Sequence, residues 1–460
     1  MTELEAKDRR IAELEVRVAE LEAQVRELLA QLGRNSLNSS LPPSRDSAEA
    51  RANRTRKTKS KRRRGGQKGH KRSVRELAPP EKVDETYDIK PMRCDGCDRR
   101  LHGDDPSPAL RQVTEIPEIV ALITEYRIHT LECPCGHRTR AEVPTEAAGC
   151  FGPRLNALVA LLTGGYRVSK RNVQELLGDV LGVDLALGSV SKLEARASEV
   201  LAVPHAEVLA HVRSAPNVNM DETSWTQDRS KAWLWVASTP DAVYYQIESE
   251  RSSQVVTDIL GPDFAGIVGN DRAKAYLVLD PEHRQVCWFH LGRNFQSKIE
   301  LGGDAARFGE QMRAFERRMW RAHHSYEADE ITADSYERRM AMVRGEVQRA
   351  LEQWSSHAGD GIAGMCKNLL GIEPAMWTFV SNPDVAPTNN RAERDIRHPV
   401  VWRRSSFGTD SLKGSRFVER ILSVVQTCKR QGQRAFEYLT NALSAARDGL
   451  AIPPLLPSTA

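Results

Sequence analysis

The sequence predicts a multidomain α+β protein with an N-terminal coiled coil, a zinc ribbon, a helical helix-turn-helix domain and an α/β core interrupted by a helical insertion. Three observations predict this organisation. Apolar residues repeat every seven positions over residues 4–32, two pairs of cysteines lie between residues 94 and 135, and strand-like runs replace helical periodicity after about residue 215. A chain of 460 residues is long enough for several domains with separate cores.

The composition predicts a cytoplasmic protein with no membrane partner. No run of about eighteen apolar residues occurs, which excludes a transmembrane helix. The first residues, MTELEAKDRR, are charged and helical in character, unlike a signal peptide. We therefore expect the cysteines to be reduced thiols or metal ligands rather than disulfides.

Residues 1–33 are predicted to form a coiled coil. β-branched residues are common at heptad position a and leucine fills position d, a combination that favours a parallel two-stranded coil. The a positions are Leu4, Ile11, Val18, Val25 and Leu32, and the d positions are Leu14, Leu21 and Leu28. This segment therefore predicts a homodimer or a higher homo-oligomer. The alternative is a single amphipathic helix that packs on the body of the protein.

Residues 34–75 are predicted to be a flexible basic arm. They show no apolar periodicity, and residues 51–72 contain twelve Lys and Arg but no acid, although the net charge of the whole chain is only +4. Such a segment binds a polyanion through counterion release, whereas a solvated linker is the alternative. The side chains that we expect to contact DNA are Arg62, Arg63, Arg64, Lys68, His70 and Lys71.

Residues 76–148 are predicted to form a DNA-binding zinc ribbon that holds one structural Zn²⁺. Two cysteine pairs flank a strand-like stretch at 116–131, and four thiolates suit a tetrahedral ion. The predicted ligands are Cys94, Cys97, Cys133 and Cys135. Because the second pair is CxC rather than CxxC, His137 or His102 could replace one thiolate. Two unrelated reduced pairs are the alternative.

Residues 149–212 are predicted to form a helical domain. Helical patterns lie at about 153–164 and 170–181, and a third helix starts near Ser189 after a turn that ends at Gly188. This arrangement fits a helix-turn-helix, whose groove-reading helix at 189–198 would place Lys192 against DNA. Any small helical bundle gives the same pattern.

Residues 213–298 and 376–445 are predicted to form one α/β core. Strand-like runs lie at 217–221, 232–238, 243–247, 266–270 and 285–290, with a helical stretch at 252–260 and a short helix before the last run. The order β-β-β-α-β-α-β, with an acid at the end of the first and fourth strands, is typical of a ribonuclease-H-like core. Residues 299–375 are predicted to be a helical insertion, the last core helix to begin near Asn390, and residues 446–460 to be a tail.

Three acidic residues are candidate metal ligands in this core: Asp221, Asp271 and Glu393. Attack on a phosphodiester by water or a 3′-hydroxyl uses two divalent ions about 4 Å apart, and hard Mg²⁺ prefers carboxylates. The three acids therefore predict a catalytic site for two Mg²⁺ ions, with Mn²⁺ as a substitute. Structural roles are the alternative: an Asp after a strand can start a turn, and Glu393 has capping-box spacing from Asn390 or could pair with Arg397.

Basic residues near these acids are candidate DNA contacts. They follow the fifth strand or lie in and after the last core helix, where they could reach backbone phosphates. They are His290, Arg293, Arg394, Arg397, Arg403, Arg404 and Arg416. A buried histidine and an ordinary charged helix face are the alternatives.

Several motifs together resemble those of insertion-sequence-66 family transposases over nearly the whole chain. Besides the zipper and the cysteine pairs, they are NSSLPPS (38–44), GGQKGH (65–70), MDETSW (220–225), CWFHLGR (287–293), TNNRAERDIR (388–397) and RFVERILSVVQTCKRQGQRAFEYL (416–439). The resemblance implies a bacterial, nucleoid-associated DDE transposase that acts on the terminal inverted repeats of its element and on target DNA. By motif position it implies that Asp221, Asp271 and Glu393 are the catalytic acids, and it implies small accessory proteins of the same element as further partners.

Two other functions remain open at this stage. A ribonuclease-H-like nuclease would cut without joining strands, although such an enzyme rarely needs three recognition modules. A dimeric DNA-binding regulator, catalytically inactive or domesticated, would bind without cutting, and the three acids argue against it.

Overall fold

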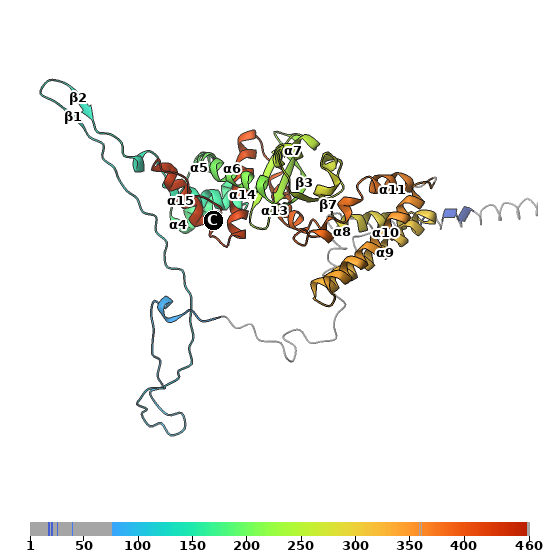
Figure 1. Cartoon of the computed structure of the whole chain (residues 1–460). Coiled ribbons are helices and arrows are strands. Elements are labelled where there is room, and N and C mark those ends of the chain that lie inside the picture. The colour runs from blue at the N-terminus through green and yellow to red at the C-terminus, as the bar shows by residue number, and fades with distance from the viewer. Residues whose placement is uncertain are drawn as a thin grey trace, which may run out of the picture. The chain divides into compact units, whose positions relative to one another are not determined.

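The computed structural model describes residues 76–357, 359 and 361–457, together with residues 17, 18, 20, 21, 25 and 39 (Figure 1). The chain divides into two units, residues 48–122 and the remainder. The predicted basic arm, including its six candidate DNA contacts, lies outside the described residues apart from Ser39. The five described residues of the predicted coiled coil are helical, but the rest of that segment is outside the description, so self-association stays a prediction.

The strand predicted at 116–131 is wrong in its extent. Only Thr130–Glu132 forms a strand (β1), which pairs in antiparallel fashion with Arg138–Arg140 (β2). Residues 116–129 belong to no strand, and apolar side chains such as Ile123 are 90% exposed. The β-branched composition favours extended backbone but supplies no neighbouring strand to pair with it.

The three predicted helices after residue 150 are present, and a fourth follows them. Their bounds are Pro153–Ala160 (α3, continued as a π-helix over Leu161–Gly165), Lys170–Leu181 (α4), Leu187–Val200 (α5) and Ala202–Ser214 (α6). Helix α4 begins where Ser169 Oγ accepts the backbone N–H of Asn172 at 3.2 Å, and it ends at Gly182, whose φ of +61° suits glycine. Apolar side chains of α3, α4 and α5 share a small core.

A mixed five-stranded sheet forms the centre of the larger unit, in the order β5-β4-β3-β6-β7. Its strands are Asn217–Gln227 (β3), Ser230–Ser238 (β4), Val243–Glu248 (β5), Ile267–Asn270 (β6) and Arg284–Val286 (β7). The first three pair antiparallel to one another, and β6 and β7 run parallel to β3. This topology, with the first strand central, is consistent with the predicted ribonuclease-H-like core.

Two strand ends differ from the prediction. Asp221 lies inside β3 rather than at its end, because β4 pairs with β3 as far as Gln227 opposite Ser230. The strand predicted at 285–290 stops at Val286, and its remaining residues begin helix α8, Trp288–Ile299.

Helices cover both faces of the sheet. Successive residues of a strand point to opposite faces, and β4 shows this with Trp235 and Val236. Val236 packs into a core with α13 (Asn390–Ser406) and α14 (Leu412–Arg430), and Trp235 packs into a core with α7 (Ser253–Leu260). Helix α13 begins at the residue where the last core helix was predicted.

Residues between α8 and α13 are mainly helical. Their helices are Gly303–Glu327 (α9), Ala333–Trp354 (α10), Ile362–Leu370 (α11), the 3₁₀ turn Pro374–Met376 and Thr378–Ser381 (α12); α15, Ala435–Arg447, follows α14. Helices α8 to α11 share a separate apolar core, and Figure 1 shows α9, α10 and α11 grouped beside α8. Throughout the described part of the chain, none of the helices combines the length and apolar character needed to cross a membrane.

Candidate active site

The register of β3 and β6 brings Asp221 and Asp271 to the same level of the sheet. The two strands run parallel, and Asn219 pairs with Gly269, two residues before each acid. Asp271 follows β6 directly, and its Oδ1 accepts the backbone N–H of Ala273 at 2.7 Å, which turns the chain away from the sheet. The two carboxylates therefore occupy corresponding positions on adjacent strands.

Glu393 reaches the same place because the start of α13 is bound to β3. Asn389 is fully buried, its Nδ2 donates to the carbonyl of Met220 at 2.7 Å, and its Oδ1 accepts from Asn219 Nδ2 at 3.0 Å. The capping-box interpretation of Glu393 is wrong, since the N-cap is Asn389 and no side chain caps the helix. Glu393 then lies four residues after the cap, in the first turn of α13.

The three acids interact electrostatically. Burial is the largest cause that holds the pKa of Asp221 well above its ordinary value, and the charges of Glu222, Asp271 and Glu393 raise it further. One backbone hydrogen bond, from Glu222 N–H to Asp221 Oδ1 at 2.9 Å, opposes this rise in pKa. The negative charges are therefore gathered closely enough to repel one another.

The three acids Asp221, Asp271 and Glu393 suit the binding of a divalent cation. Mutual repulsion among buried carboxylates becomes attraction when a cation lies between them. Within the described residues, Glu393 Oε1 and His290 Nδ1 are buried and make no hydrogen bond. Carboxylate oxygens are the ligands that Mg²⁺ prefers, so the donor chemistry also agrees.

Glu222 has a different role from its neighbour Asp221. Its carboxylate is fully buried, accepts a hydrogen bond from Tyr276 Oη at 2.6 Å and pairs with Arg251 Nη2 at 2.5 Å. Burial raises the pKa of Glu222, and these two partners lower it. Because successive residues of a strand point to opposite faces, Glu222 lies on the other face of β3 from Asp221, and its contacts neutralise its charge within the protein.

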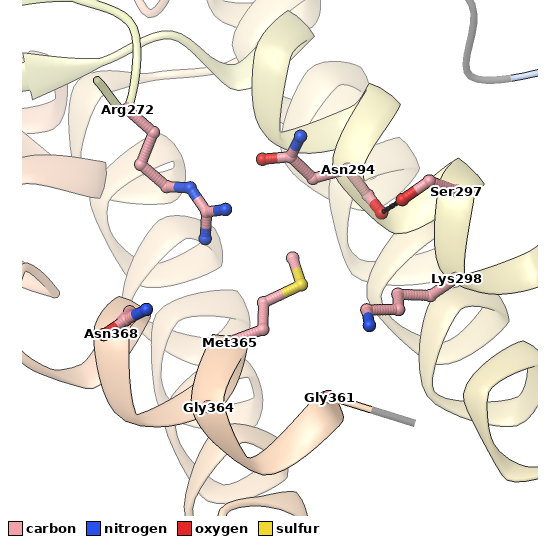
Figure 2. A pocket seen from close by; sticks show the side chains of 8 residues that line it. All are labelled: Arg272, Asn294, Ser297, Lys298, Gly361, Gly364, Met365 and Asn368. Carbon is pink, nitrogen blue, oxygen red and sulfur yellow. Dashed lines mark hydrogen bonds between the residues drawn. The ribbon is translucent and has the colours of Figure 1, made fainter. Parts of the chain in front are cut away.

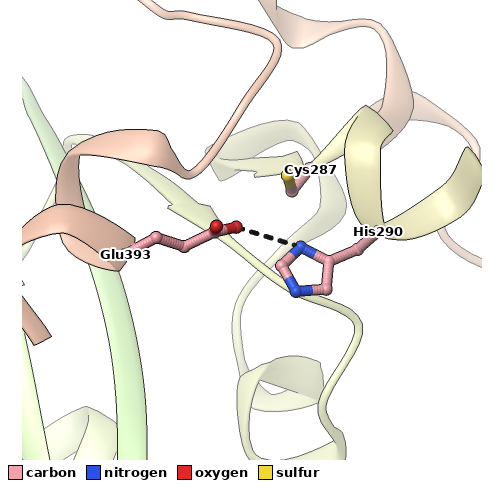
Figure 3. A group of neighbouring side chains, drawn as sticks. All are labelled: Cys287, His290 and Glu393. Atoms are coloured by element: carbon pink, nitrogen blue, oxygen red, sulfur yellow. Dashed lines mark ion pairs between the residues drawn. The ribbon is translucent and has the colours of Figure 1, made fainter. Parts of the chain in front are cut away.

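His290 lies beside Glu393. Its Nδ1 is 3.4 Å from Glu393 Oε1, and with Cys287 the two residues place three possible ligand atoms within 4.8 Å of one another (Figure 3). Burial lowers the pKa of His290, and the charge of Arg293 lowers it further. Burial raises the pKa of Cys287, so at neutral pH the imidazole is the stronger ligand of the two.

The two predicted zinc knuckles each form a tight turn, within different units of the chain. In the first, Cys94 O accepts the backbone N–H of Asp98 at 2.8 Å; in the second, Cys133 O accepts that of Gly136 at 2.8 Å. A backbone N–H of Gly96 and the thiol of Cys97 lower the pKa of Cys94. Backbone and thiol hydrogen bonds in the second turn lower the pKa of Cys135 in the same way.

The candidate DNA contacts of the core divide into exposed and engaged residues. Lys192 on α5 and three arginines on α13 are exposed: Arg394, Arg397 and Arg404. Arg293 is half-buried on α8. Arg403 instead donates to Thr223 Oγ1 at 3.0 Å and to Ser224 Oγ at 2.5 Å, and Arg416 pairs with Glu419 at 2.9 Å. Arg403 therefore ties α13 to β3, and the pair formed by Arg416 lies within α14.

Sequence reasoning missed the amide pair Asn219–Asn389 and the partners of Glu222. The two consecutive asparagines before Arg391 were a signal that a buried amide anchors this turn. Arg251 and Tyr276 carried no such signal, because their contacts with Glu222 depend on how α7 and the following loop fold over the sheet.

Comparison with known proteins identifies two regions of similarity. The family described as "Transposase IS66 family" matches residues 148–416, and "Family of unknown function (DUF6444)" matches residues 1–76. A curated relative, "Uncharacterized protein y4qI" of Sinorhizobium fredii, is 24% identical over 273 residues, which cover 53% of this chain and 50% of the relative. The chain thus spans about half the length of that relative.

Proposed function

The chain belongs to the Transposase IS66 family, and we propose that it cuts the terminal inverted repeats of a bacterial insertion sequence and joins the freed 3′ ends to target DNA. The observation that carries this proposal is the convergence of Asp221, Asp271 and Glu393. Two of these acids come two residues after paired positions on the parallel strands β3 and β6, and the third lies in the first turn of α13, which is bound to β3. Their charges act on one another within a partly buried site.

The three acids would hold two Mg²⁺ ions, or Mn²⁺ in their place. When bound, such ions activate the attacking oxygen and stabilise the leaving oxygen of a phosphodiester. Asp221 and Asp271 are fixed by the sheet, so their carboxylates need little reorganisation to bind cations. Asn389 and Asn219 set the position of α13 and with it Glu393. His290 Nδ1 lies 3.4 Å from Glu393 Oε1, and this contact would restrict the rotamers of the carboxylate.

Exposed cations of the same unit would hold the DNA backbone. Arg394 and Arg397 project from α13 close to Glu393 in sequence, and Lys192 lies on the predicted groove-reading helix. The basic arm adds charge for sequence-independent attachment. Double-stranded DNA is therefore the proposed partner, both as element ends and as target.

We also propose that the four cysteines Cys94, Cys97, Cys133 and Cys135 bind one structural Zn²⁺ per chain. Lowered thiol pKa values favour the thiolate, which is the ligand form. The metal content of protein purified without added zinc tests this proposal, and a Cys94→Ser, Cys133→Ser variant is the control. Absence of zinc from the wild-type chain would exclude the ligand set.

The catalytic proposal is tested with a labelled duplex that carries the ends of the encoding element. Wild-type chain with Mg²⁺ should produce both cleaved and joined products, whereas Asp221→Ala should bind the duplex without cutting it. Cleavage without joined products would identify a nuclease instead. Binding with neither product would identify a DNA-binding regulator, and an active Asp221→Ala variant would remove this acid from the site.

A further inference from the structure

A cavity of about 380 Å³ lies next to Asp271, between the loop after β6 and helices α8 and α11. Figure 2 shows its lining: Arg272 from the loop, side chains of α8, and residues of α11 on the opposite wall. The lining residues are Arg272, Asn294, Ser297, Lys298, Gly361, Gly364, Met365 and Asn368. Nothing in the proposed catalytic chemistry uses this space.

The chemistry of the walls suits an anion with several acceptor oxygens. Arg272 and Lys298 supply positive charge, and Asn294 and Asn368 supply amide N–H donors. Planar guanidinium groups match the oxygens of a phosphate in bidentate fashion. In Figure 2 the guanidinium of Arg272, the amide of Asn294 and the ammonium of Lys298 point toward the same space.

Arg272 gives the strongest indication. Its Nη1 is buried and, within the part of the chain that the structure describes, has no hydrogen-bond partner. A buried donor without an acceptor costs about 1–3 kcal/mol, and more when it is charged. A ligand oxygen in the cavity would remove that cost.

The wall formed by α11 is open because it carries glycine. A Cβ atom built on Gly364 meets no atom within 4 Å. This helical residue can also accept a side chain without backbone strain. The position therefore offers a way to fill the cavity without displacing its neighbours.

We propose that this cavity binds a DNA backbone phosphate adjacent to the phosphodiester that is cut, with Arg272 as its main contact. The inference rests on the proposed function, because it places the cut phosphodiester at Asp271. Arg272 is the residue that follows Asp271 in the chain, and successive phosphates follow one another along the backbone of a DNA strand. A strand held at Asp271 thus brings its neighbouring phosphate to the cavity, where it is fixed in register for cleavage.

The test measures DNA binding by the full chain in Ca²⁺, using the element-end duplex and duplexes with one neutral methylphosphonate at successive positions around the cut. Arg272→Gln should weaken binding, and it should reduce the slope of log Kd against log salt by about one. The matched control is Arg339→Gln on the exposed face of α10, which should leave binding unchanged. On the duplex whose methylphosphonate replaces the phosphate bound in the cavity, next to the cut, Arg272→Gln should not weaken binding any further.

A second pair of variants tests the cavity itself. Gly364→Leu should fill it and weaken binding about as much as Arg272→Gln, whereas Gly364→Ala should bind like wild type. Additive losses for Arg272→Gln at every methylphosphonate position, or wild-type binding by Gly364→Leu, would overturn the proposal. If the phosphate coupling is present but Mg²⁺ supports no cleavage, the cavity stands and the transposase proposal fails. If the chain cuts the duplex but the phosphate coupling is absent, the transposase proposal stands and the cavity proposal fails.

Discussion

The anchor of α13 gives a prediction that the structure makes quantitative. Asn389 is fully buried and makes two side-chain hydrogen bonds to β3, one to the carbonyl of Met220 and one to the amide of Asn219. Asn389→Ala removes both bonds and leaves their partners buried. With about 1 kcal/mol for each bond and a further penalty for unpaired groups, the free energy of unfolding should fall by about 2–4 kcal/mol.

The same change should reduce cleavage, because α13 carries Glu393. A displacement of about 1 Å at a reacting centre can reduce the rate about 100-fold. The rate of single-turnover cleavage at saturating DNA should therefore fall by roughly one to two orders of magnitude, the loss expected for a displacement of about that size. Affinity for the duplex should change little, since the exposed arginines of α13 remain.

Urea unfolding and single-turnover cleavage measure the two effects on the same protein. Asn382→Ala is the matched control, since Asn382 Nδ2 donates only a local bond to Thr378 O at 2.8 Å. This control should lose about 1 kcal/mol at most and cut at the wild-type rate. An Asn389→Ala variant that is destabilised yet cuts as fast as wild type would refute the positioning role. Unchanged stability would refute the hydrogen-bond argument itself.

Three further predictions concern pH, the site histidine and self-association. Burial raises the pKa of Glu419 from its ordinary value of 4.5 to about 7, so this group stabilises the fold at low pH and loses that contribution as the pH rises through 7. Glu419→Gln should reduce the fall in unfolding free energy between pH 5 and pH 8 by about 3 kcal/mol in urea titrations, and an unchanged pH profile would contradict the assignment. His290→Gln should lower the single-turnover rate more than the affinity for DNA; a loss of affinity alone would make His290 a DNA contact instead. Removal of residues 1–33 should reduce the mass measured by sedimentation to that of a monomer, and an unchanged mass would exclude the coiled coil as the only interface.

The order of the strands could be predicted from the sequence because side-chain alternation is a local property. Runs such as 232–238 and 243–247 carry this signal in their own residues. The start of α13 near Asn390 could likewise be predicted from local sequence. Asp271 could be placed for the same reason, since it follows its strand directly. These predictions needed no knowledge of tertiary contacts.

Features that depend on pairing could not be predicted in this way. Asp221 lies inside β3 because β4 continues to pair beyond it, which no property of residues 217–221 reveals. Residues 116–129 have strand composition but no partner strand. Arg403 was predicted to contact phosphate, yet it binds β3, because the packing of α13 on the sheet decides which of its cations remain exposed.

The role of Asp271 as a metal ligand is the most direct test of the proposed active site. Asp271→Cys replaces a hard oxygen ligand by sulfur, which Mg²⁺ binds poorly and Mn²⁺ accepts more readily. The measurement is the ratio of cleavage rates in Mn²⁺ and in Mg²⁺, for this variant and for wild type, on the element-end duplex. We predict that the variant loses cleavage in Mg²⁺ and recovers part of it in Mn²⁺, so that its ratio rises well above that of wild type. A variant that cuts in Mg²⁺ at the wild-type rate, with an unchanged ratio, would contradict the site.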